Sequence, residues 1–599
     1  MANSFGSLYV GASGLQSASH GLNTTANNLT NVNTEGYVRE QVVYEDRNYR
    51  KIGTAAISNQ YAGLGVQVGT IVHTRDIFLD KAYRQENGRY SFYRASSEAV
   101  QEVITQLQES EGVAFKDAIA DFEIAFEEFA KDPSDTVYQN LVLQKASLFL
   151  SRAKAVEDGF EDYQTIINSK IREDLESINE IGKKIVDLNK RIQAIEAAKV
   201  EKAMDLRDTR DLLLDKLSGL VKMSYSEDPT GVVHVEIEGV EFIDDVNFYE
   251  VGILTNRRTG FVTPYWPQLS DIVSEDDESL NTYYEIFDLT NVDAEKDTDL
   301  GEIKALLLAR GDDWSTYLNY RDENGNQITV EKYKDTIANS IMMNSESELD
   351  TLIHQVVTEI NNIYSPIIEA SKAYKNSTIT YEDADGNTIT LDANARILDE
   401  ENCSVGSDGE LPPRELFVRI GTERYKAIDA TITKADGSQE VKKLYVYNEE
   451  DPTDTAKCYT LKALFINEDL VKQESYLPHR KYKDQAQVDH PLGTRLSAIW
   501  GEQDFNLNPA DTTPCGYNGF YVKWIGEIGN TGNVYASTER SLEGTKEEIE
   551  FSRQGVIGVS SDEELTIMIK YQSAYNASSR YINVINEMIE HLITSLGNA

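Results

Sequence analysis

Apolar residues recur along the end of the chain at alternating steps of three and four residues. The mean period of about 3.5 residues predicts a helix that packs along a partner helix with a left-handed supercoil. A second apolar row, from Ile567 to Met588, runs beside the first and widens the apolar face. We predict that a partner covers this helix through the first row, which consists of Met568, Tyr571, Tyr575, Ile582, Ile585, Ile589, Leu592 and Leu596.

The beginning of the chain carries a matching pattern. Leucines recur every seven residues at Leu8, Leu15, Leu22 and Leu29, and small residues lie between them, which allows another helix to approach closely. Four glycines in this segment each weaken an isolated helix by about 1 kcal/mol, whereas burying four leucines contributes roughly 6–12 kcal/mol in all. We therefore expect the segment to pair with the C-terminal helix and to become ordered when neighbouring molecules cover it.

Between the two ends, helical and extended patterns alternate in long blocks. Apolar residues from Ile171 to Ile195 predict a long bundle helix, and the alternation from Val221 to Ile243 predicts strands. We expect an α+β multidomain protein with β-rich domains inserted between helical parts. Its predicted parts are a coiled-coil-like axial part (1–60 and 553–599), a helical-bundle stem (76–220 and 516–552), a β-rich domain with helices (221–370) and a variable outer domain (371–515).

The composition narrows the possible partners. The formal net charge of −44 disfavours nucleic acid and anionic membranes, because both would be repelled. No run of eighteen apolar residues occurs, so no transmembrane helix is expected, and the first thirty residues do not resemble a secretory signal peptide. The three cysteines, Cys403, Cys458 and Cys515, cannot all pair within one chain and form no Cys-x-x-Cys motif.

Candidate catalytic and metal-binding residues are sparse. The chain has no Gly-x-Ser-x-Gly, His-Glu-x-x-His, Walker or dinucleotide-binding motif, so we expect neither catalysis nor a cofactor. His479 and His490, with Asp489 between them, could hold a metal ion. A solvated surface loop is the favoured interpretation of that segment, because nothing else in the sequence completes a ligand set.

Three stretches of the sequence resemble a known family. The first, from Ala26 to Tyr37, is similar to the signature of the bacterial flagellar rod, hook and hook-associated proteins, and it contains Ala26, Asn27, Asn28, Asn31, Asn33 and Gly36. The second, from Asp205 to Ser218, contains Arg210 and Asp211 and is similar to a block of the hook-associated protein 1 family. The third, from Gly558 to Met588, also resembles that family.

The resemblance implies a structural role in the bacterial flagellum, at the junction between hook and filament, with the paired terminal helices lining the axial tube. It implies several partners: the hook protein, the second junction protein (hook-associated protein 3), further copies of the chain, and a cytoplasmic export chaperone on the C-terminal helix. It also implies export without a cleaved signal peptide and an extracellular location on the flagellum.

Two alternatives stay open at this point. A hook or distal rod protein would share the Ala26–Tyr37 motif, although the long helix at Ile171–Ile195 and the second stretch speak against it. A secreted hydrolase or adhesin, displayed on flagella through 371–515, is the alternative from another functional class.

Overall fold

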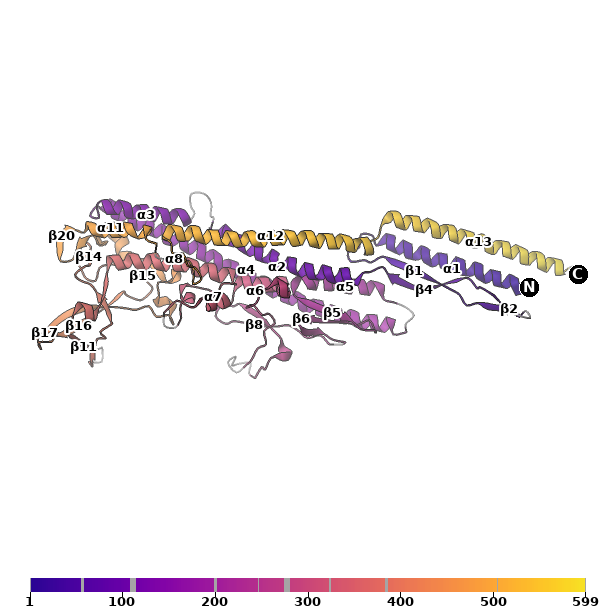
Figure 1. Cartoon of the computed structure of the whole chain (residues 1–599), viewed down its shortest axis with the longest axis horizontal. Helices are drawn as coiled ribbons and strands as arrows, with labels where there is room; N and C mark the ends of the chain where they lie inside the picture. The colour runs from indigo at the N-terminus through magenta and orange to yellow at the C-terminus, as the bar shows by residue number, and fades with distance from the viewer. Residues whose placement is uncertain are drawn as a thin grey trace.

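The structure is a computed structural model that describes residues 2–54, 59–107, 115–198, 202–245, 247–273, 281–322, 325–382, 386–503 and 505–597. The molecule is elongated, with both termini at one end and a mixed group of short strands and helices at the other (Figure 1). The predicted α+β fold, with long terminal helices and β-sheets inserted between helical parts, is confirmed. Among the described residues, no helix is both long and apolar enough to cross a membrane.

The terminal helices form one end of the molecule. Helix α1 (Ala2–Thr30) lies antiparallel to α13 (Ser561–Gly597), so that Gly11 faces Ile582 and Gly21 faces Tyr571. A β-carbon on Gly11 would lie 2.7 Å from Ile582, which explains why this contact requires glycine. Strands β1 (Glu40–Asp46) and β4 (Val66–His73) form an antiparallel hairpin beside α1, extended by β2 (Arg50–Thr54) and β3 (Asn59–Ala62).

Five long helices build the stem. They are α2 (Ile77–Leu107), α3 (Phe115–Lys131), α4 (Thr136–Glu196), α5 (Met204–Leu220) and α12 (Tyr517–Ile557). Helix α12 runs antiparallel along α2, and the side chain of Asp135 caps the start of α4. Helices α6 (Glu302–Arg310), α7 (Val330–Thr336) and α8 (Ile341–Tyr364) follow the β-strands of the middle region, and α6 and α8 pack on α4.

Two small antiparallel sheets lie in the middle region. Strands β5 (Met223–Glu227), β6 (Val233–Ile237) and β7 (Val240–Ile243) form a meander, and β8 (Gly252–Thr255) pairs with β9 (Val262–Tyr265). Their inward side chains, such as Val235 and Trp266, join the same apolar core as the stem helices. The middle sheets and the stem therefore share one core.

A six-stranded sheet at the far end has an apolar core of its own, which includes Ile379, Ile428 and Leu444. Its order is β10 (Ile367–Glu369), β13 (Arg396–Leu398), β17 (Gln439–Tyr447), β16 (Tyr425–Thr433), β11 (Thr378–Glu382) and β12 (Thr388–Thr390). All adjacent strands are antiparallel. This sheet is the separately packed part of the expected outer domain.

The remainder of the segment expected to be the outer domain, 371–515, packs on the stem. Phe417, Leu461, Leu492 and Trp500 are buried in the main core, so the sequence-based boundary takes in too much of the chain. Phe417 lies on β15 (Phe417–Arg419) and Leu492 on α11 (His490–Ala498), whereas Leu461 and Trp500 lie on short 3-10 helices, Leu461–Ala463 and Ile499–Gly501. The other short elements of this segment are β14 (Ser404–Val405), β18 (Leu464–Ile466), α10 (Glu468–Lys472), β19 (Arg480–Lys481) and β20 (Asp484–Val488).

Candidate assembly interface

The contact between α1 and α13 is made by small residues of α1. Gly11, Ala18 and Gly21 are buried along it, and a β-carbon on Gly21 would lie 2.6 Å from the ring of Tyr571. Leu8, Leu15, Leu22 and Leu29 are only half-buried, because they lie on the flank of this contact. The predicted leucine row is therefore left partly open to a further neighbour.

The predicted row on α13 faces α1 along most of its length. Ile585 is the most buried member, with 9% of its surface exposed, and Met568, Tyr571, Ile582 and Ile589 are half-buried. Tyr575 and Leu592 are more exposed, and the side chain of Leu596 lies outside the described part of the structure. One face of α13 is thus already occupied within a single chain.

The second apolar row of α13 faces solvent. Its members Val584 and Met588 are 52% and 57% exposed, and Ile569 and Ile593, which lie outside the row, are more exposed still. An apolar row of this length on the surface of one chain is typical of a protein–protein contact. The structure therefore leaves an open apolar face at the end where both termini meet.

Asn28 connects the two ends of the chain. Its amide nitrogen donates to Glu564 Oε2 at 3.2 Å and to the Glu40 carbonyl at 3.0 Å. Its amide oxygen accepts from the Tyr37 hydroxyl at 2.9 Å and from the Glu40 backbone N–H at 3.0 Å. Arg39 Nε donates to Glu564 Oε1 at 2.8 Å. The buried amide is fully paired, and it fixes α1 to the first turn of α13.

The remaining motif residues shape the turn that ends α1. Asn31 donates to the Asn27 carbonyl at 3.1 Å and to its side-chain oxygen at 3.0 Å. Gly36 has a φ of 77°, in the left-handed region that favours glycine, and a β-carbon there would lie 3.3 Å from Leu212 of α5. Ala26 and Asn33 are exposed. The turn therefore docks the axial part onto the stem.

A network of alternating charges, here called the hinge network, lies where α2, α5 and α12 meet the axial part. Arg553 donates to Asp80 at 2.8 Å and to Asp215 at 2.6 Å, and Arg84 donates to Asp215 at 2.7 Å. Three arginines and three aspartates take part: Arg75, Arg84, Arg553, Asp80, Asp211 and Asp215. Buried ions of both signs satisfy one another, whereas a lone buried charge would be strongly destabilising.

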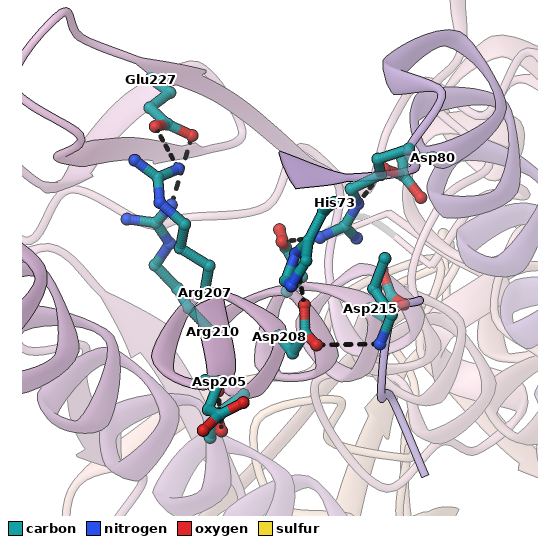
Figure 2. Close-up of polar contacts among 12 residues, drawn as sticks. His73, Asp80, Asp205, Arg207, Asp208, Arg210, Asp215 and Glu227 are labelled. Atoms are coloured by element: carbon teal, nitrogen blue, oxygen red, sulfur yellow. Dashed lines mark hydrogen bonds and ion pairs between the residues drawn. The ribbon is translucent and has the colours of Figure 1, made fainter. Parts of the chain in front are cut away.

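The motif residues Arg210 and Asp211 are adjacent in the sequence, but their side chains point to different sides of α5 and join different contacts. Arg210 is 1% exposed and donates to Asn189 Oδ1 at 3.0 Å, to the Gly231 carbonyl at 2.7 Å and to Glu227 at 3.2 Å. Burial lowers the pKa of Arg210 to about 10, so it stays charged at neutral pH. Figure 2 shows Arg210 and Arg207 reaching toward Glu227, away from His73 and Asp208. Asp211 joins the hinge network instead.

The histidine pair considered for metal binding has a structural environment. A solvated position was expected for His479, but the side chain is buried. Its Nδ1 lies 2.7 Å from the Leu477 carbonyl oxygen, and its Nε2 accepts a hydrogen bond from Arg480 at 3.1 Å. In the described part of the chain, the side chains whose ligand atoms lie close enough together to share a metal ion are Asp228, His234 and Asp245. His479 and His490 are not among them. These three residues lie close together in the sequence, on and beside the β5–β7 meander, but their spacing matches no recognisable metal-binding motif.

Three segments of the chain match families of flagellar proteins. Residues 100–366 match the family described as the flagellar hook-associated protein FlgK helical domain. Residues 8–37 match the flagella basal body rod protein family, and residues 554–595 match the flagellar basal body rod FlgEFG protein C-terminal family.

Relatives of full length carry one description. The chain is 22% identical to flagellar hook-associated protein 1 of Bacillus subtilis over 100% of this chain and 99% of that protein. It is 20% identical to flagellar hook-associated protein 1 of Salmonella typhimurium over 97% and 98%. The basal-body rod protein FlgG of Buchnera aphidicola is 36% identical but matches only 14% of this chain and 32% of its own length.

Among solved structures, the hook junction protein FlgK of Burkholderia pseudomallei aligns with 12% identity and a TM-score of 0.44, covering 80% of this chain and all of that one.

Proposed function

Because this chain belongs to the flagellar hook-associated protein 1 family, we propose that it is a structural component of the bacterial flagellum that joins hook to filament. It assembles through its paired terminal helices. The likeness to a rod protein covers only 14% of the chain, whereas the likeness to hook-associated protein 1 extends over its whole length. A hook or rod protein is therefore the less favoured alternative, and no observation favours a displayed hydrolase or adhesin.

One observation carries the proposal. The two termini pair at one end of an elongated molecule and leave an apolar face of α13 exposed, together with half-buried leucines on α1. A face of this kind needs neighbours, and copies of the chain arranged around a common axis would supply them. We propose that the hook protein and hook-associated protein 3 contact the two sides of this assembly.

Before assembly, a different partner must shield the same apolar face from solvent. We propose that a small cytoplasmic chaperone binds α13 through its exposed row until the chain is exported, without a cleaved signal, to the outside of the cell. The supporting observation is that Val584 and Met588 lie open to solvent in the single chain. The partners and the axial interface residues are both part of this proposal.

The test places a charge on the open face. A Val584→Glu, Met588→Glu chain should fold normally, because both side chains are more than half exposed. Its amount in the culture medium is measured separately, because the proposed chaperone contacts the same face, and the assembly test uses cells in which the exported amount equals that of the parent. In the assembled tube each carboxylate would be buried unpaired, which costs on the order of several kcal/mol. Cells that depend on this chain should therefore lose their filaments. Ile585 is a weaker test site, because its side chain already packs within one chain.

The matched control is Val441→Glu on β17, an exposed valine at the opposite end of the molecule that should leave filaments intact. Normal filaments on cells with the Val584→Glu, Met588→Glu chain would show that the open face is not an assembly contact.

A further inference from the structure

Phe551 projects from α12 near the hinge network without joining the core. Its side chain is 81% exposed, and exposed glutamates, Glu547 and Glu548, lie one turn before it. Arg553, two positions later, points toward α2, where it pairs with Asp80. Residues two apart on a helix point about 200° apart, so Phe551 faces away from α2. The helix thus presents one aromatic ring with an acidic surround.

A cavity of about 300 Å³ lies on the other side of α2. Met223, Tyr225 and Leu300 give it an apolar lining. Its charged lining residues are three basic ones and one acidic one, which are Lys81, Arg84, Lys222 and Asp297. An engineered apolar cavity of about 150 Å³ holds a benzene molecule, so this one has room for a phenyl ring. The exposed Phe78 lies on the same helix face as Lys81, three residues away, and extends the apolar surface beside the cavity.

The aromatic side chain and the cavity lie at the same level of the molecule. Helices α2 and α12 are antiparallel, with Arg553 bonded to Asp80 and the Lys546 amine 3.6 Å from the centre of the Tyr90 ring. Phe551 lies between those two contacts on α12, and the cavity-lining Lys81 lies between them on α2. The two features are therefore on opposite flanks of one helix pair, as a head-to-tail contact between identical copies requires.

We propose that Phe551 of one copy enters the cavity lined by Met223, Tyr225 and Leu300 of the next copy. The acidic residues around Phe551 then face the basic residues of the cavity, although the chain as a whole carries a net charge of −44. This inference rests on the proposed function, because it specifies a lateral contact between assembled copies. The contact lies outside the terminal helices, so it can fail while the proposed function stands.

The first test replaces the aromatic ring. A Phe551→Asp chain should melt like the parent, because the side chain is exposed in the single chain. In cells lacking the parent gene it should be exported, but its retention on hooks should fall at least about tenfold, since aromatic side chains in a pocket dominate contact energies. The matched control is Phe78→Asp, which should have a smaller effect because Phe78 borders the cavity without filling it. Full retention of the Phe551→Asp chain would overturn the proposal.

A charge-reversal pair tests the partner directly. One chain carries Lys81→Glu and Lys222→Glu, and the other carries Glu547→Lys and Glu548→Lys. Each chain alone should assemble poorly because like charges face each other at every contact. The two chains expressed together should assemble again, because each cavity then meets an oppositely charged helix of the other chain. A folding defect cannot be rescued by such mixing.

Two outcomes of the charge-reversal test overturn the inference: unimpaired assembly of either reversed chain alone, or no recovery on mixing. The Val584→Glu, Met588→Glu chain separates this failure from that of the proposed function. If that chain fails to assemble while the Phe551→Asp chain assembles, the lateral contact is wrong and the axial role stands. If the Val584→Glu, Met588→Glu chain assembles, the proposed axial role itself is wrong.

Discussion

Glu348 makes the stability of the stem depend on pH. It lies on α8, is 1% exposed, and accepts a hydrogen bond from Asn508 at 3.0 Å. Burial raises the pKa of Glu348 to about 8, whereas the pKa of an unfolded glutamate is about 4.3. Between these two values the folded chain holds a proton that the unfolded chain has lost. Stability is therefore full at low pH and decreases as the pH rises toward 8.

The size of the effect follows from proton linkage. Each pH unit in this interval lowers the free energy of unfolding by about 1.4 kcal/mol per such group. Between about pH 5.5 and pH 7.5, Glu348 alone therefore removes about 3 kcal/mol. Glu157 on α4 is also buried, and its pKa is likewise raised to about 8, so it adds a decrease of the same sign.

Substituting glutamine for Glu348 isolates this effect. The Glu348→Gln side chain is always neutral and keeps an oxygen that can accept the hydrogen bond from Asn508. We expect the variant to exceed the parent in free energy of unfolding by about 4 kcal/mol near pH 7.5, and the difference to fall to about 1 kcal/mol near pH 5. Urea unfolding followed by tryptophan fluorescence measures this, because Trp524 is buried in the stem core.

The control is Glu548→Gln on the exposed face of α12, which should change neither the stability nor its pH dependence. If the parent and the Glu348→Gln chain lose stability with the same slope between pH 5 and pH 8, Glu348 is not protonated in the folded stem. Its carboxyl group would then not be the source of the pH dependence.

Three further predictions concern the junctions between parts. Asn28→Ala leaves buried partners of its amide unpaired, at about 1–3 kcal/mol each, so proteases should remove α13 faster while the control Asn33→Ala behaves like the parent. Arg210→Lys loses the forked contacts of a buried guanidinium and should lower the free energy of unfolding by about 3 kcal/mol; an unchanged urea midpoint would contradict this. Deleting 371–515 should prevent the stem from folding, because the deletion removes side chains of the stem core. Replacing 378–390, which contributes to the separate core of the six-stranded sheet, by a short Gly/Ser turn should leave the melting of the stem helices, followed by circular dichroism, unchanged.

Long periodic segments were the most predictable part of the fold. The rows through Ile171–Ile195 and Met568–Ile589 lie on helices α4 and α13, because an apolar repeat of three and four residues, sustained over many turns, fits a helix and does not fit a strand. The segment from 448 to 515 was not predictable in the same way. Its elements are short, so its apolar residues show no period, although Leu461 and Trp500 are both buried in the main core.

The axial pair shows what periodicity leaves undetermined. A heptad of leucines marks a face of α1, but it does not say on which side the partner lies. In the structure the partner lies against Gly11 and Gly21, because small residues let the two backbones approach closely, and the leucines are left on the flank. The glycines that weaken an isolated α1 are thus the residues that make its pairing with α13 possible.

The motif residues could be located from the sequence, but their contacts could not, because the contacts depend on distant parts of the chain. Asn28 bonds to Glu564, and Gly36 packs against Leu212. These contacts place the axial pair at one fixed position on the stem. The hinge network also fixes the orientation of the axial pair relative to the stem. Charged hydrogen bonds depend on angle as well as distance, whereas an apolar contact allows the two surfaces to slide. Phe551 lies within one turn of Arg553, so the same network that orients the axial helices also holds the proposed lateral contact in register with them.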